Sequence, residues 1–292
     1  MNEFNQPICY CYGNCQAKLL NIFLQDHPVL KNKYQFHYYY IGNSITTINI
    51  DLLRKTQLFI YQYVKDTTLP HDDALYLDSK QYTVEYIKQN YLPKTCISIS
   101  FPSIFFDAYW PYMGFLSDAH SMHKNEFFDG YVQNKLYELV QNANLSETDI
   151  LNKVDDSHFI FDFDMNLCYE NSCKNLQIRE QVNKVDIPLS SYLIENFKKI
   201  QLMNTLNHPT VHVFNYLINK INELLKLEYT DYLLKDTKYN NFCDATYKIP
   251  IFPCIVRHFG LENCNIGPFY VLTKPFQTRQ DFYLYFIRKI RN

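Results

Sequence analysis

Short apolar runs alternate with amphipathic segments along the first hundred residues of the chain. Residues 8–12 form a continuous apolar run typical of a buried strand, and apolar side chains recur at helical spacing within residues 16–25. The same pattern predicts strands at 34–41, 57–63 and 95–100, with helices that end near 52–55 and cover 81–89. Strands that alternate with helices require crossover connections. We therefore expect an α/β fold, in which a parallel sheet is flanked by helices in three layers.

From about residue 124 the pattern becomes helical, with predicted helices at 124–142, 146–154, 165–182, 190–203 and 209–227. The last has the clearest apolar stripe, and Pro209 suits its first helical position. The aromatic-rich segment 228–292 resists assignment by periodicity. We expect an α/β catalytic domain at 1–227 with a helical second half, and an irregular C-terminal extension at 228–292 that packs on the same domain.

Composition narrows the classes of function. Only six of the 292 residues are glycine, where average usage gives about 20, so glycine-rich phosphate loops are excluded. A net charge of -2 gives no electrostatic reason to expect nucleic acid as a partner. Nine irregularly spaced cysteines favour reduced thiols and a cytoplasmic protein, and no apolar run reaches the length of a membrane span. A basic C-terminal segment leaves peripheral membrane contact open; it contains Arg279, Arg288, Lys289 and Arg291.

The turn after the first predicted strand is the first candidate site. It has the sequence Gly13-Asn14-Cys15-Gln16, and ligands bind at the carboxyl ends of strands in open parallel sheets. Asn14 is a good helix N-cap, which places Cys15 in the first turn, where the helix dipole favours a thiolate. Cys15 is therefore a candidate nucleophile, with backbone N–H groups available for an oxyanion. The alternative is a tight turn in which Cys15 packs as a small hydrophobe.

The second candidate is His208, which follows Asn207 at the predicted start of the helix at 209–227. A histidine at a helix N-terminus stays neutral more readily, as a general base requires. A cysteine and a histidine at two helix starts resemble a nucleophile–base pair, although a histidine that only caps a helix is the simpler reading.

Other polar and aromatic residues lie at the same predicted edge of the sheet. Gln62 ends the third strand and Ser103 follows the fourth, while Tyr109 and Trp110 form an aromatic loop suited to stacking on a sugar or to packing over the core. The cluster Asp118, His120 and His123 fits solvated loop residues better than a metal site, and we expect no metal.

Taken in order, five short motifs resemble the WcbI-like polysaccharide biosynthesis enzymes over about residues 8–227. They are Gly13-Asn14-Cys15-Gln16, Tyr61-Gln62, Phe101-Pro102-Ser103 with a following Tyr-x-Pro loop, Arg179-Glu180 with Asp186, and Asn207-His208-Pro209-Thr210. The resemblance implies an SGNH/Rossmann-like fold and a coenzyme A-dependent acetyltransferase that modifies a hydroxyl of a capsular or surface polysaccharide sugar. Cys15 then stands where the distantly similar SGNH hydrolases have serine, and His208 where they have histidine.

The resemblance also implies roles for further residues. Gly13, Asn14, Gln16, Gln62, Ser103, Tyr109 and Trp110 would shape the oxyanion or substrate site, and Arg179, Lys184 and Asn207 would contact coenzyme A. Acetyl-CoA is the expected acyl donor and a sugar or polysaccharide the acceptor.

This sequence departs from the hydrolases before the histidine. Thr205-Leu206-Asn207-His208 replaces their D-x-x-H, so an orienting carboxylate would have to come from elsewhere, with Glu180 and Asp186 as candidates. An esterase or deacetylase with a Cys–His dyad, and a non-catalytic glycan-binding protein, are the alternative functions.

Overall fold

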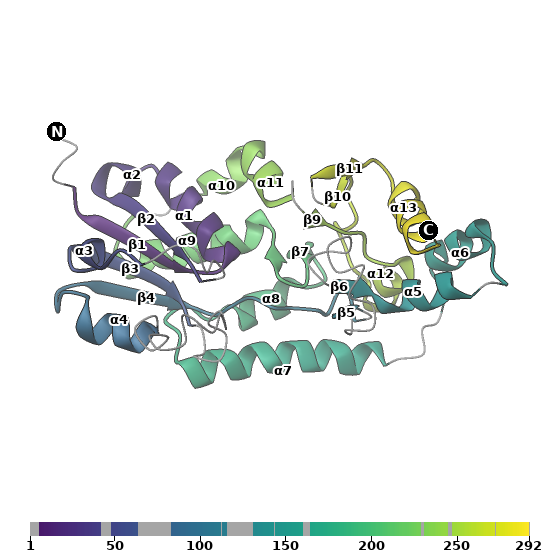
Figure 1. Cartoon of the computed structure of the whole chain (residues 1–292), viewed down its shortest axis with the longest axis horizontal. Helices are drawn as coiled ribbons and strands as arrows, with labels where there is room; N and C mark the ends of the chain where they lie inside the picture. The colour runs from purple at the N-terminus through teal and green to yellow at the C-terminus, as the bar shows by residue number, and fades with distance from the viewer. Residues whose placement is uncertain are drawn as a thin grey trace. The chain divides into compact units, whose positions relative to one another are not determined.

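The computed structural model describes residues 6–41, 48–63, 83–111, 113–115, 131–142, 144–159, 164–228, 231–244, 247–271 and 273–291 (Figure 1). The chain divides into two compact units. Unit 1 contains Met1–Ile104, Gln177–Ser190 and Phe214–Lys235, and unit 2 contains Phe105–Leu176, Ser191–Val213 and Asp236–Asn292. The boundary expected near residue 227 falls inside the last stretch of unit 1.

Unit 1 is built on a parallel four-stranded sheet with the order β2-β1-β3-β4. The strands are β1 (Ile8–Gly13), β2 (Gln35–Tyr40), β3 (Thr56–Gln62) and β4 (Ile97–Phe101). Between them lie α1 (Cys15–Asp26), α2 (Leu30–Lys33), α3 (Ile50–Leu53) and α4 (Val84–Asn90). The apolar pattern predicts the four strands and the helices α1, α3 and α4, but not the short α2, and the α/β prediction is confirmed.

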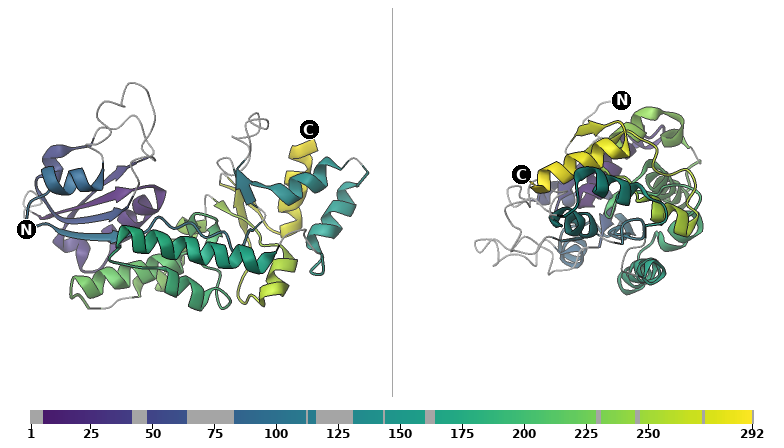
Figure 2. Two further views of the ribbon diagram at one scale, coloured as in Figure 1. Left: turned by 90° about the horizontal axis from the view of Figure 1, so that it is seen from below. Right: turned by 90° about the vertical axis from the view of Figure 1, so that its right-hand side faces the viewer.

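Helices cover both faces of this sheet (Figure 2). Since the chain passes from β1 to β2 in one direction and from β3 to β4 in the other, right-handed crossovers place α1 and α4 on opposite faces. Tyr10 and Tyr12 of β1 pack on the α4 side in a cluster that includes Val84 and Ile87. The first strand is buried along its whole length, which explains its uninterrupted apolar sequence.

Unit 2 combines helices with small antiparallel sheets. The pairs are β5 (Met113–Phe115) with β6 (Tyr131–Gln133) and β7 (Met203–Thr205) with β8 (His208–Pro209). A third sheet has the order β11-β10-β9, from Lys274–Phe276, Phe269–Val271 and Tyr247–Lys248. Its helices are α5 (Asn134–Gln141), α6 (Glu147–Asp155), α8 (Ser190–Asn196), α11 (Thr237–Asp244), α12 (Pro253–Phe259) and α13 (Arg279–Arg291).

Two long helices carry the chain from one unit to the other. They are α7 (Met165–Asn183) and α9 (Val211–Leu224); the short α10 (Tyr232–Lys235) belongs to unit 1. Within unit 1, Phe214 of α9 contacts Phe23 of α1 edge to face, with ring centroids 5.2 Å apart. The second half of the chain therefore contributes a helix to the unit that holds the parallel sheet.

Several predicted boundaries in the second half are wrong. Residues 131–133 form β6 where a helix was expected, and α8 ends at Asn196 because the chain then leads into β7. Helix α9 begins at Val211 because Pro209 is paired in β8. The described part of the segment after residue 228 is not irregular, since it contains four helices and a three-stranded sheet.

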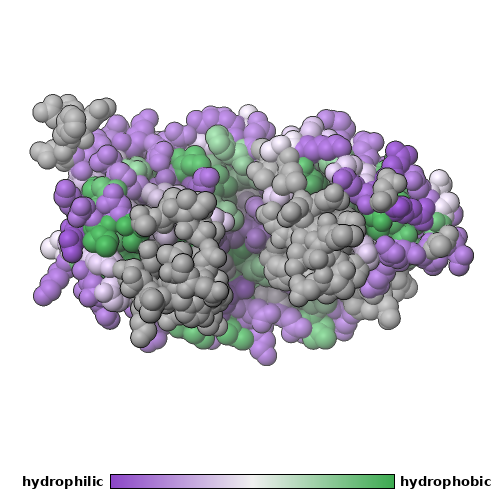
Figure 3. All heavy atoms as spheres, in the orientation of Figure 1, coloured by the Kyte–Doolittle hydropathy of each residue, from purple (hydrophilic) through white to green (hydrophobic). Residues whose placement is uncertain are grey.

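The described surface in Figure 3 is mainly hydrophilic, and hydrophobic residues appear there in small separate patches. Within the described residues, no helix has both the length and the apolar content needed to cross a membrane. The basic C-terminal segment forms α13, whose Arg279 and Arg288 pair with Asp155 and Glu147 of α6 at 3.0 and 3.2 Å. These arginines thus have acidic partners within unit 2.

Candidate functional site

The turn from β1 to α1 lies at the switch point of the parallel sheet. The strand order is β2-β1-β3-β4. The connection that leaves the carboxyl end of β1 runs to β2, and the one that leaves the carboxyl end of β3 runs in the opposite direction to β4. Gly13 ends β1 and Gln62 ends β3, so both residues lie at this edge. Open α/β sheets bind ligands at such a point.

The buried side-chain amides of Gln16 and Gln62 stabilise the turn between β1 and α1 through hydrogen bonds. The Oε1 of Gln62 accepts a hydrogen bond from the backbone N–H of Asn14 at 3.0 Å, and its Nε2 donates to the Oε1 of Gln16 at 2.7 Å. Gln16 in turn donates to the carbonyl of Ile104 at 2.6 Å and accepts from the N–H of Ile104 at 3.0 Å. Gln62 and Gln16 are both buried, so their amides connect β3, α1 and the segment after β4.

Asn14 is the N-cap of α1, as the sequence predicts. Its side chain accepts a hydrogen bond from the N–H of Gln16 at 2.9 Å and donates to the Oγ of Ser103 at 3.4 Å. Tyr38 of β2 donates to the backbone carbonyl of Asn14 at 3.0 Å. Asn14 therefore contacts Tyr38 in β2 and Ser103 after β4, in addition to Gln16 in its own helix.

Cys15 occupies the first position of α1 and is exposed. None of the nine cysteines, all of which lie in the described part of the chain, forms a disulfide. Burial raises the pKa of seven others, namely Cys9, Cys96, Cys168, Cys173, Cys243, Cys254 and Cys264. A thiolate at Cys15 instead faces solvent and the positive end of the helix dipole, which are conditions that favour it.

Tyr38 is a site residue that sequence reasoning missed. Burial raises its pKa, and charges on the neighbouring Tyr40 and Cys15 raise it further, so its hydroxyl stays protonated beside the turn. The signal was its place near the carboxyl end of β2, next to β1 in the sheet.

His208 lies in unit 2, in a two-stranded hairpin. It belongs to β8 and is the register partner of Thr205 in β7, across a turn formed by Leu206 and Asn207. The Nδ1 of His208 lies 2.5 Å from the Oγ1 of Thr205, and its ring lies 5.2 Å from the ring of Tyr247. The histidine therefore precedes α9 in a hairpin and does not occupy its first turn.

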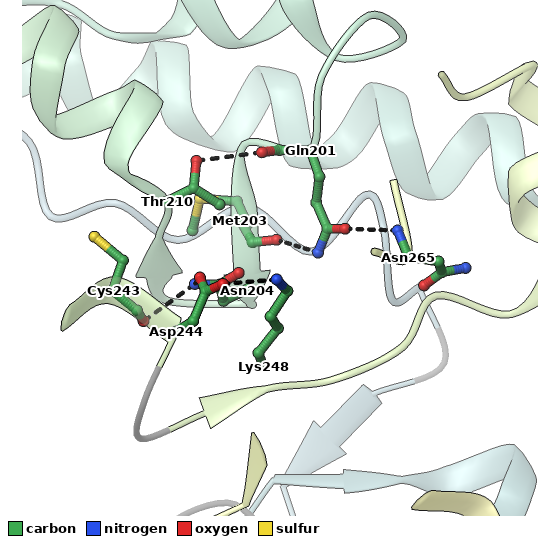
Figure 4. A network of polar contacts seen from close by, with 8 residues as sticks. All are labelled: Gln201, Met203, Asn204, Thr210, Cys243, Asp244, Lys248 and Asn265. Carbon is green, nitrogen blue, oxygen red and sulfur yellow. Dashed lines mark hydrogen bonds and ion pairs between the residues drawn. The ribbon is translucent and has the colours of Figure 1, made fainter. Parts of the chain in front are cut away.

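A network of polar contacts anchors this hairpin (Figure 4). Asn204, the middle residue of β7, donates to the carbonyl of Cys243 at 3.1 Å and to the carboxylate of Asp244 at 2.8 Å. Asp244 also pairs with Lys248 at 2.6 Å. Residues from the C-terminal segment thus fix the strand that carries Thr205.

A second part of the same network lies at the start of the hairpin. Gln201 donates to the carbonyl of Met203 at 2.9 Å and accepts from the N–H of Asn265 at 3.0 Å. Thr210 donates from its hydroxyl to the carbonyl of Gln201 at 3.2 Å (Figure 4). The two strands are therefore tied to each other and to the C-terminal segment within unit 2.

The aromatic loop after β4 packs inward. Tyr109 and Trp110 are fully buried in unit 2. Tyr109 donates to the carbonyl of Phe197 at 2.9 Å, and Trp110 donates to the carbonyl of Pro250 at 3.2 Å. Of the two readings of this loop, packing over the core fits the structure, because a buried ring offers no face for a sugar to stack on.

The two carboxylates considered for orienting the histidine have other partners. Glu180 accepts hydrogen bonds from the N–H groups of Leu189 and Ser190, at 2.6 and 2.8 Å, where α8 begins. Asp186 accepts from the N–H and hydroxyl of Ser100 at 2.8 and 2.7 Å. Both stabilise local structure in unit 1.

The residues expected to contact coenzyme A are distributed over both units. Arg179 is half-buried in α7, Lys184 is exposed just beyond it, and both belong to unit 1. Asn207 lies in the turn of the hairpin in unit 2, where its Oδ1 accepts from the hydroxyl of Thr205 at 3.2 Å.

Asp118, His120 and His123 lie outside the described residues. Among the residues that are described, no group of three or more His, Cys, Asp or Glu side chains is placed to hold a metal ion.

Comparison with known proteins identifies the family. Residues 8–230 match the family model described as polysaccharide biosynthesis enzyme WcbI. The chain belongs to the WcbI family. The resemblance seen in the short motifs is thereby confirmed, and the chain is a member of a family of polysaccharide biosynthesis enzymes. No curated protein matches the chain.

A solved structure of WcbI has the same fold. It is 18% identical in sequence, with a TM-score of 0.71, and the alignment covers 98% of this chain and 93% of that one. That structure is of native WcbI without a disulfide bond between coenzyme A and one of its cysteines. At this identity the likeness establishes the α/β fold of this WcbI family member.

Proposed function

We propose that this protein transfers an acyl group, acetyl in the simplest case, from coenzyme A to a hydroxyl of a capsular or surface polysaccharide sugar. One observation carries the proposal: Cys15 is exposed in the first turn of α1, at the switch point of the sheet of a WcbI family member. Seven other cysteines have pKa values raised by burial, and the eighth, Cys11, is fully buried in β1, which leaves Cys15 as the thiol best suited to acyl chemistry.

In the proposed first step, the Cys15 thiolate attacks the thioester carbonyl of the acyl-coenzyme A. The bond between the carbonyl carbon and the coenzyme sulfur breaks, and the coenzyme leaves as a thiolate that takes up a proton. The first turn of α1 offers backbone N–H groups that stabilise the oxyanion. The WcbI structure is consistent with a cysteine near coenzyme A, since it is described by the absence of a disulfide bond between the coenzyme and one of its cysteines.

In the second step, the sugar hydroxyl attacks the acyl-cysteine carbonyl. His208 takes the hydroxyl proton, and the bond to the Cys15 sulfur breaks to restore the thiolate. Direct transfer from coenzyme A to the sugar, with His208 as the base and Cys15 lining the oxyanion site, is the other route to the same products. Arg179 and Lys184 are proposed to bind the phosphates of the coenzyme as cations.

The test is acyl transfer from radiolabelled acetyl-CoA to a capsular polysaccharide acceptor by Cys15→Ala, Cys15→Ser and His208→Ala variants. We expect each variant to lose at least about a hundredfold in kcat/KM, the range typical of removing a nucleophile or a general base. Acid quenching followed by mass spectrometry separates the two routes, since only the first leaves an acetyl group on the peptide that contains Cys15.

Two controls sharpen the result. Cys264→Ala removes a thiol whose pKa burial raises, and it should leave transfer unchanged. The Cys15→Ala/His208→Ala double variant should lose little more than either single variant if the two residues act in one reaction. Full transfer by both single variants would overturn the proposed roles, and hydrolysis of acetyl-CoA without transfer to any sugar would favour an esterase.

A further inference from the structure

The hairpin places the side chain of Thr205 beside the ring of His208. Thr205 ends β7 and is almost fully buried, and His208 begins β8 as its register partner. Thr205 Oγ1 and His208 Nδ1 lie 2.5 Å apart, within hydrogen-bonding reach. The geometry follows from the two-residue turn, which brings residues at positions i and i+3 directly opposite each other.

Thr205 has a single hydroxyl proton and two neighbouring acceptors for it, the Oδ1 of Asn207 at 3.2 Å and the Nδ1 of His208 at 2.5 Å. When the hydroxyl donates to Asn207, the contact with His208 is satisfied only if Nδ1–H of His208 donates to the lone pair of Thr205 Oγ1. In a neutral imidazole, a proton on Nδ1 leaves the lone pair on Nε2.

We propose that Thr205 is the positioning residue of this enzyme's general base: it fixes His208 as the Nδ1–H tautomer and so makes Nε2 the atom that accepts a proton. This inference rests on the proposed function only for the use of Nε2 in acyl transfer. Thr205 stands three residues before His208, where a D-x-x-H motif has its carboxylate. A neutral hydroxyl therefore does the orienting work that a carboxylate does in a Ser-His-Asp triad.

The neutral partner has a chemical consequence. A carboxylate at Nδ1 would stabilise the imidazolium that forms when the base takes a proton, whereas a hydroxyl only aligns the ring. The elements packed against β7 carry Asp244, Tyr247 and Lys248, and Asp244 and Lys248 are paired with each other. The ring of Tyr247 lies against that of His208 and supports the same orientation.

The test is nitrogen NMR of the full-length protein labelled with ¹⁵N-histidine, with His208→Gln used to assign the signal. In the unaltered protein and in Thr205→Ser, we expect the shifts of the Nδ1–H tautomer at high pH. Thr205→Val keeps the shape but removes the acceptor, and the preference should be lost. An Nε2–H tautomer in the unaltered protein, or identical shifts in Thr205→Val, would overturn the proposal.

Asn207 supplies an independent arm of the same experiment. Asn207→Asp can only accept, so it should keep the hydroxyl of Thr205 pointing away from His208 and preserve the tautomer. If the amide nitrogen of Asn207 were instead the group that faces Thr205, Asn207→Asp would reverse the tautomer, and that reversal would contradict the assignment.

Kinetics then separates the inference from the proposed function. Thr205→Val should lower kcat for acyl transfer by about tenfold with little change in KM, and Thr205→Ser should restore it. Thr205→Asp should move the acidic limb of the pH profile about one unit upward, because a carboxylate favours the protonated ring. Full acyl transfer by His208→Ala would refute the proposed role of His208 as the general base. The NMR experiment would still show which tautomer His208 adopts, so the two failures are distinguishable.

Discussion

The side-chain oxygen of Gln62 accepts a hydrogen bond from the backbone N–H of Asn14, which lies 48 positions earlier in the chain. The bond joins the carboxyl ends of two neighbouring parallel strands, and Cys15 follows immediately on one side of it. Because Gln62 is fully buried, water does not replace this bond when it is lost. The position of the proposed nucleophile therefore depends on an amide in another strand.

Replacement of Gln62 by leucine should destabilise the protein by about 3 kcal/mol, since it deletes one buried and one partly buried hydrogen bond and leaves the N–H of Asn14 unsatisfied. Urea unfolding measures the loss. The rate at which iodoacetamide alkylates Cys15, followed by mass spectrometry, should also change, because the turn that carries the thiol loses its support.

Gln57→Leu is the matched control for that variant. Gln57 lies in the same strand and accepts from the N–H of Ile8 at 2.6 Å, but at the opposite end of β1 from Cys15. We expect a loss of about 1 kcal/mol with unchanged alkylation of Cys15. Equal effects of the two leucine variants on alkylation would refute the special role of Gln62.

Gly13→Ala should be more damaging than an ordinary glycine substitution. A Cβ at this position would lie 2.6 Å from the Oε1 of Gln62 and 2.7 Å from the Cβ of Ala17, both closer than atoms pack. We expect a loss of about 3 kcal/mol in thermal or urea unfolding. Gly260→Ala, where φ is +62° and the space is open, should cost only about 1 kcal/mol. A smaller loss for Gly13→Ala than for Gly260→Ala would show that the turn adapts.

The stability of the protein should fall as the solution becomes acidic, in part because of His27. Burial lowers the pKa of this histidine from 6.5, and its Nδ1 accepts from the N–H groups of Val29 and Leu30. The stability contributed by the neutral ring is present above pH 6.5 and is lost as the pH falls through the lowered pKa. Unfolding free energies at pH 7.5 and 5.5 should differ less in His27→Asn, which keeps an acceptor without a titrating group. Identical differences in the two proteins would exclude His27.

Asn204→Leu should loosen the hairpin that carries His208. The change removes the bonds to Cys243 and Asp244 at a fully buried position, and we expect a loss of about 2 kcal/mol. Lys238→Met is the control. Lys238 lies in α11, the helix that contains Cys243 and Asp244, but its ion pair with Asp236 is half-exposed and contributes little to stability. Unchanged histidine NMR signals in Asn204→Leu would show that the hairpin does not need this anchor.

The sequence predicts the sheet of unit 1 well because its elements are long enough to display a period. In β1, Cys9 and Cys11 face one side and Tyr10 and Tyr12 the other, and burial of both sides produces the apolar run that identifies the strand. Asn14 could be recognised as a cap for a local reason, since its side chain bonds to a backbone group two positions away.

The hairpin of unit 2 could not be predicted in this way. Strands of two or three residues show no period, and proline is as acceptable in a short edge strand as in the first position of a helix. The sequence therefore favours Pro209 as the first residue of α9 with His208 at its N-terminus, whereas both residues lie in β8. The sequence does not reveal Thr205 as the partner of His208, because their contact depends on the turn between them. It also leaves open whether Trp110 is buried, because composition does not show which way a loop faces.

The order of the segments in unit 1 has a consequence for synthesis on the ribosome. The strands of the parallel sheet are complete at Phe101, but Phe214, which packs against Phe23, emerges long afterwards. A nascent chain would thus carry α1 without α9, the helix that later packs against it, while much of unit 2 is translated. Such a chain exposes apolar surface for an extended time, and it is the kind of folding intermediate that chaperones bind.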